Sequence, residues 1–132
     1  MGTAERVLTV IALVSVPTVM VGGYSLMRLV TTRKLNDFQL AVFRAGHAHA
    51  GVLLVLTLAA LGIAGRADLP EPHIWTIGAL LATGTISQSG GFFLHAGIGT
   101  PGKWSAGNTV TVLGAGMLAV ALLALAYGVA TS

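Results

Sequence analysis

The chain contains no cysteine and few charged residues. The lack of cysteine excludes disulfides, thiolate metal ligands and cysteine nucleophiles. Charged residues make up 8% of the 132 residues, whereas soluble domains carry about 25%. Hydrophobic residues make up 55%, and this composition predicts an integral membrane protein. The net charge of +3 therefore indicates membrane orientation, and we expect no nucleic-acid partner.

Four apolar stretches each have about the 20 residues that a helix needs to cross the hydrocarbon core of a bilayer. They cover residues 7–27, 42–64, 74–96 and 108–130. Charged residues, glycine and proline gather in the segments between them, as is typical of loops. The sequence therefore predicts a single all-α domain, residues 1–132, built as a bundle of four transmembrane helices.

The positive charges of the connecting segments predict how the bundle is oriented. Fewer Lys and Arg residues fall on the side of the two termini, namely Arg6 and Arg66, than on the opposite side, namely Arg28, Arg33, Lys34 and Lys103. Because positive loops face the cytoplasm, we expect a multi-pass protein of the cytoplasmic (inner) membrane. Both termini should then be non-cytoplasmic.

Ionisable residues occur inside the second and third apolar stretches, where they usually indicate function. Arg44, His47 and His49 lie near the start of the second stretch, and His95 ends the third. In an up-and-down bundle these positions fall on one side of the membrane, together with Asn108 at the start of the last stretch. His47 and His49 are separated by about 200° around a helix, so they do not bind one small ion together. The alternative interpretation is that each histidine is simply interfacial.

No Asp or Glu lies inside the four stretches. A proton-coupled exporter needs a carboxylate within the membrane, so the sequence disfavours that class. Zinc and di-iron sites need carboxylates or thiolates beside their histidines. Histidine without carboxylate favours haem b, which one or two imidazoles can hold, with Arg44 pairing with a propionate. The candidate cofactor-binding residues are then His49, His47, Arg44 and Asn108.

Segment 87–91, Ser-Gln-Ser-Gly-Gly, precedes His95 in the third stretch. Gln88 lies two helical turns before His95 on nearly the same face. Small residues allow helix backbones to approach closely, so one interpretation of the segment is helix packing. The other is the floor of a cavity, where the glycines leave room for a flat cofactor or a substrate.

The pattern Ala48-His49-Ala50-Gly51 entering an apolar helix, followed later by Gly91-Phe92-Phe93, a Gly/Pro-rich loop and a last apolar helix, resembles the membrane-bound styrene oxide isomerases. The resemblance covers residues 43–123. It implies a homotrimer of four-helix subunits with haem b between neighbouring subunits. It also implies isomerisation of a small apolar epoxide to a carbonyl compound, with the ferric haem as Lewis acid. The axial iron ligand of the family falls on His49, with His47 as the competing alignment.

The chain departs from this family at two positions. The active-site tyrosine of the family falls at Phe93, which lacks the hydroxyl, and its polar asparagine falls at Val55. Gln88 or His95 would then supply the missing polar group beside Phe93. If His95 instead ligates the second face of the iron, a six-coordinate haem results, which suits electron transfer or sensing.

Two functions therefore remain open besides the isomerase. One is a non-enzymatic b-type haem protein of the membrane, and the weaker alternative is a haem-free structural or transport protein. The partners expected are further copies of the chain, the lipid bilayer and a small apolar substrate.

Overall fold

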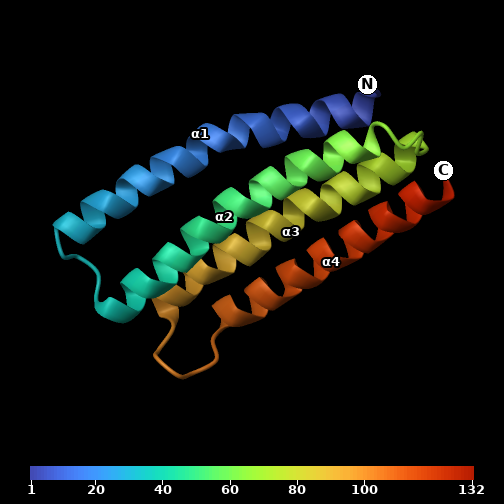
Figure 1. The fold of residues 1–132 in the computed structure, drawn as a ribbon. Helices are drawn as coiled ribbons and strands as arrows, with labels where there is room; N and C mark the ends of the chain where they lie inside the picture. The colour runs from blue at the N-terminus through green and yellow to red at the C-terminus, as the bar shows by residue number, and fades with distance from the viewer.

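The computed structural model describes residues 1–132 and consists of four α-helices without a strand. The helices are α1 (Thr3–Thr31), α2 (Asp37–Ala64), α3 (Glu71–Ile98) and α4 (Ala106–Thr131). They run antiparallel in sequence order, and both termini lie at the same end of the bundle (Figure 1). The predicted all-α class and the four helices are confirmed.

Each helix contains its predicted apolar stretch and extends beyond it at one end or both. The extensions at the starts of α2 and α4 have local causes. Gln39 N–H donates to Asn36 Oδ1 over 2.8 Å, and Asn36 N–H donates to Gln39 Oε1 over 3.2 Å, which forms a capping box before α2. Ser105 and Asn108 form the equivalent box before α4. A polar first turn is thus part of the helix although it is not part of an apolar run.

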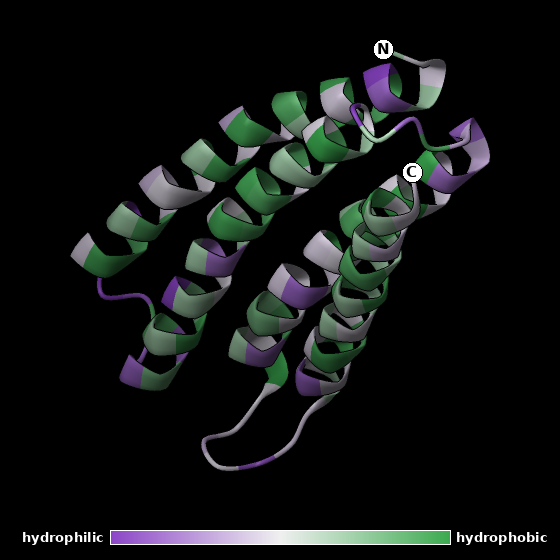
Figure 2. Ribbon diagram, turned by 45° about the vertical axis from the view of Figure 1, so that its right-hand side comes forward, coloured by the Kyte–Doolittle hydropathy of each residue, from purple (hydrophilic) through white to green (hydrophobic).

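Three of the helices, α1, α2 and α4, are long and apolar enough to cross a membrane. The fourth, α3, is more polar because Thr83, Thr85 and segment 87–91 lie in its second half. This helix packs against all three others, so much of its surface faces protein. Polar colouring accordingly gathers at the loops and in the parts of α2 and α3 near the α3–α4 loop (Figure 2). That α3 also crosses the membrane stays a prediction.

Glycines bring α3 and α4 together in the half of their interface nearer the α3–α4 loop. A Cβ atom placed on Gly91 would lie 2.5 Å from Thr111 N and 2.6 Å from Gly107 O. A Cβ on Gly84 would likewise lie 3.0 Å from Gly114 O. No side chain fits at these distances, so the two backbones are in direct contact.

Buried aliphatic side chains continue this interface toward the end that holds the termini. The main cluster joins α2, α3 and α4 and consists of Ala60, Ala64, Ile77, Leu81, Leu118, Ala121 and Leu125. Helix α1 joins the bundle through a smaller cluster of Ala4 and Leu8 with Leu61 and Ile74. Helix α3 is therefore held firmly between α2 and α4, and it carries its C-terminal histidine to the opposite end.

Candidate functional site

The start of α2, the end of α3 and the start of α4 meet at the end of the bundle opposite the termini (Figure 1). Two contacts between aromatic rings join α2 to α3 here. Phe38 of α2 packs edge-on against His95 of α3 with ring centroids 5.2 Å apart, and His49 packs against Phe92 with centroids 4.7 Å apart. The structure thus brings Arg44, the three histidines and Asn108 to one end. His73, exposed in the first turn of α3, lies at the other end.

His49 is half-buried on the face of α2 that meets α3. Its Nδ1 atom lies 2.8 Å from the carbonyl oxygen of Ala45, one turn earlier. A carbonyl can only accept a hydrogen bond, so Nδ1 carries the proton and donates it. In the neutral ring Nε2 is then the unprotonated nitrogen, and this is the form in which imidazole binds a metal. Histidines that ligate metals usually donate their other ring N–H in this way.

His47 faces a different helix. A Cβ atom on Gly22 of α1 would lie 3.5 Å from His47 Nδ1, and one on Gly23 would lie 3.0 Å from His47 Nε2. The ring therefore rests against a surface of α1 that two glycines leave open. The angular separation expected from the spacing of His47 and His49 is what the structure has, since the two rings contact different helices.

His95 is tied to the start of α4 by a short chain of hydrogen bonds. Ser105 Oγ donates to Asn108 Oδ1 over 3.2 Å and lies 2.7 Å from His95 Nδ1. The Ser105 hydroxyl has one proton, and when that proton goes to Asn108, Ser105 accepts from His95 Nδ1. Nε2 is then the unprotonated nitrogen of the neutral His95 ring.

A cavity of about 320 Å³ lies between α2, α3 and α4 at this end. His95 and Asn108 line it, together with Ala41, Ala45, Phe92 and Trp104. His49 is not a lining residue, although its two contacts, Ala45 and Phe92, both are. The cavity therefore connects the surroundings of His49 with those of His95.

The remaining candidate residues are Phe93, Gln88 and Arg44. Phe93 packs against Phe43 with ring centroids 4.8 Å apart. Gln88 is half-buried, and its carbonyl accepts from Thr111 Oγ1 over 3.3 Å. Arg44 is exposed. No hydrogen bond or ring contact joins Phe93 or Gln88 to His49 or His95.

Segment 87–91 takes part both in helix packing and in a cavity, which are the two interpretations that the sequence left open. Gly91 packs against the backbone of α4, as expected for helix packing, whereas Ser89 lines a second cavity between α1, α2 and α3. Sequence reasoning did not place this cavity between α1, α2 and α3, and it missed Phe92 beneath His49 and Ser105 beside His95. The Ser105-x-x-Asn108 spacing is a recognisable helix cap, so Ser105 had a signal in the sequence.

No group of three or more His, Cys, Asp or Glu side chains lies close enough to hold a metal ion. A comparison of the chain with protein-family models, with curated proteins and with solved structures finds no match. The function is therefore argued from the residues themselves and from the resemblance stated above.

Proposed function

We propose that the chain is a haem b-binding integral membrane protein in which His49 is the axial iron ligand. The observation that carries the proposal is the hydrogen bond from His49 Nδ1 to the Ala45 carbonyl, which fixes the ring and leaves Nε2 free. His47 lacks such a partner, and its ring rests against the glycines of α1. This difference favours His49 over His47.

The dimensions and charges of this end fit a haem shared between subunits. The 320 Å³ cavity beside Phe92 is at the lower end of the range for small-molecule sites, about 300–1,000 Å³, so one chain does not enclose a macrocycle. A second copy would complete the site, in agreement with the homotrimer that the resemblance implies. Arg44 is exposed about one and a half turns before His49 and is free to pair with a propionate carboxylate. Asn108 has its side-chain oxygen in the α4 cap, which leaves its amide N–H groups for a ligand.

The activity we propose is isomerisation of a small apolar epoxide to a carbonyl compound. Ferric haem, when bound, supplies a Lewis acid for the epoxide oxygen. The chain contributes the imidazole of His49, an apolar wall that includes Phe43 and Phe93, and polar groups at Gln88 and His95 to orient the substrate. All four helices, α3 included, would cross the cytoplasmic membrane.

A non-enzymatic haem protein is the second candidate, and His95 is the observation that favours it. When Ser105 accepts from its Nδ1, the Nε2 atom of the neutral ring is open to a metal, as it is in His49. If His95 ligates the second face of the iron, the haem is six-coordinate and suited to electron transfer or sensing. Replacing His95 separates the two functions, since only the second requires it for the haem spectrum.

The test of the iron ligand is the haem content of histidine variants purified from a host supplied with haem. We expect His49→Ala to lose most of its haem and its Soret absorbance, because the substitution removes the proposed axial imidazole. His73→Ala is the matched control, since His73 is exposed at the opposite end, and it should keep full haem content. Full haem content in His49→Ala would overturn the assignment, and loss only in His47→Ala would transfer it to His47.

A further inference from the structure

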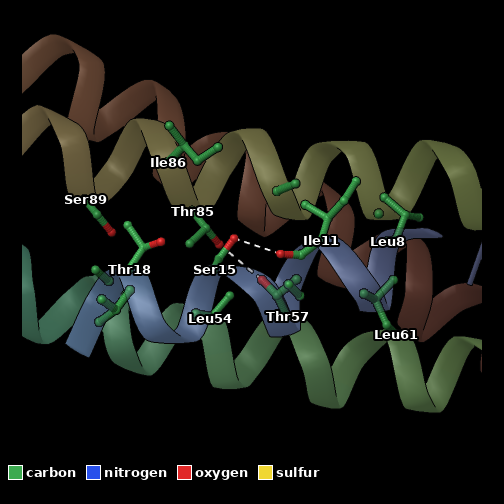
Figure 3. Close-up of a pocket in the computed structure, with 15 residues that line it drawn as sticks. Leu8, Ile11, Ser15, Thr18, Leu54, Thr57, Leu61, Thr85, Ile86 and Ser89 are labelled. Carbon is green, nitrogen blue, oxygen red and sulfur yellow. Dashed lines mark hydrogen bonds between the residues drawn. The ribbon is translucent and has the colours of Figure 1, made fainter. Parts of the chain in front are cut away.

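A second cavity lies between α1, α2 and α3, in the middle of the bundle (Figure 3). Its volume is about 260 Å³. Most of its lining is aliphatic, and no ionisable side chain contributes to it. The polar atoms that reach it are the hydroxyl groups of Ser15, Thr18, Thr57, Thr85 and Ser89. It shares no lining residue with the cavity at His95.

One of these hydroxyls is buried without a partner. Ser89 is 5% exposed, and its Oγ atom is buried without a hydrogen bond. In Figure 3 this side chain points from α3 into the space that the cavity occupies. Of its neighbours, Thr57 and Thr85 bond to each other over 3.1 Å, Ser15 donates to the Ile11 carbonyl over 2.8 Å, and Thr18 is exposed.

Ser89 is the one residue of this bundle whose side-chain oxygen is buried without a partner. Ser15, Ser25 and Thr83 each donate to the carbonyl four residues earlier, which is the usual partner of a serine or threonine in an apolar helix. Ser89 makes no such bond to Thr85. A buried donor without an acceptor costs free energy, and an acceptor inside the cavity would recover it.

We propose that this cavity binds a neutral, lipid-soluble molecule of the size of a substituted benzene, whose single oxygen accepts a hydrogen bond from Ser89. Neutrality follows from the absence of charge in the lining. The size follows from the volume, since an apolar cavity of about 150 Å³ holds benzene and this one is larger. Ketones, aldehydes, ethers and epoxides have the required acceptor.

The molecule would enter from the side of the bundle. Ile11 of α1 and Ile86 of α3 line the cavity and are 52% and 72% exposed, so they lie at its opening to the outer surface. In a membrane this surface faces lipid, where such ligands concentrate. The proposal goes beyond the haem site and does not require it.

The test compares two ligands of the same shape, acetophenone and isopropenylbenzene, which differ in that a CH₂ group replaces the carbonyl oxygen. Binding to the protein in nanodiscs is measured by equilibrium dialysis, with empty nanodiscs subtracted. The wild-type protein should bind acetophenone about threefold to tenfold more tightly, the value of one neutral hydrogen bond. Ser89→Ala should remove this preference, because the methyl group keeps the shape and loses the donor.

Ser15→Ala is the matched control, because the Ser15 hydroxyl also lines the cavity but is already used by Ile11, and it should keep the preference. Ala82→Leu fills the cavity and should abolish binding of both ligands. The same measurements on His49→Ala exclude binding at the proposed haem site. Equal binding of the two ligands by the wild-type protein, no binding above that of empty nanodiscs, or an undiminished preference in Ser89→Ala would overturn the proposal.

Discussion

His47 and His49 are two positions apart on α2, yet different contacts hold their rings. The spacing predicts that they face different directions, and this is what the structure has. His49 and Ala45 lie one turn apart in the same helix, so the helix that the sequence predicts is enough to form their hydrogen bond. The glycines beside His47 belong to α1, and Phe92 beside His49 belongs to α3. These partners depend on how the helices pack, which the spacing of histidines in α2 does not determine.

Two adjacent glycines of α3 provide a test of packing at the residue scale. Gly91→Ala should lower the free energy of unfolding by about 1–3 kcal/mol, because the new Cβ meets the α4 backbone at Thr111 and Gly107. Gly90→Ala has no atom within 4 Å of its Cβ and should raise the free energy of unfolding by about 0.5–1 kcal/mol through helix propensity. Thermal and denaturant unfolding followed by circular dichroism measure both. Equal effects of the two substitutions would contradict the backbone contact between α3 and α4.

At the scale of the helices, the apolar runs predict the number and the order of the helices well. They predict less well where each helix starts. The end of α2 at Ala64 matches its prediction, whereas its start lies at Asp37 rather than at residue 42. The difference is the polar first turn, which Asn36 and Gln39 cap. A criterion based on apolar residues excludes such a turn, whereas the capping pattern identifies it.

Helix α3 shows why apolarity and position in the bundle are separate properties. Like α2, it packs against all three other helices, yet it is the one helix not apolar enough to be a candidate span by itself. Its glycines and hydroxyl residues serve close packing and line the central cavity. The cavity exists because three helices meet around it, so no periodicity within one helix predicts its position or the unpaired hydroxyl of Ser89.

For the whole molecule, the predicted orientation in the membrane is the easiest prediction to test. The natural sequence lacks cysteine, so single substitutions give unique labelling sites. Ser132 follows α4 at the end of the bundle that holds both termini, and Lys103 lies in the α3–α4 loop at the opposite end. The two labelling variants are Ser132→Cys and Lys103→Cys. We expect a membrane-impermeant maleimide to label Ser132→Cys in intact cells and Lys103→Cys only after the membrane is opened, because the loops richer in Lys and Arg face the cytoplasm. The reverse pattern would place the termini in the cytoplasm.

The same end of the bundle that carries the positive loops carries the three histidines and Arg44, so orientation also fixes the side of the proposed haem site. In the function proposed above, a second copy of the chain completes the haem site beside Phe92, because the cavity of one chain is too small for a macrocycle. Haem content and oligomeric state should therefore change together when His49 is replaced.

Whether this protein binds haem through His49 is decided by the absorbance spectrum of the purified wild-type protein, oxidised and reduced. We expect a Soret band with the high-spin features of five-coordinate ferric haem, and we expect the band to shift when an imidazole or amine ligand occupies the open face of the iron. A low-spin spectrum that requires His95 would instead select the non-enzymatic haem protein. Absence of a Soret band from protein produced with ample haem would show that the protein does not bind haem.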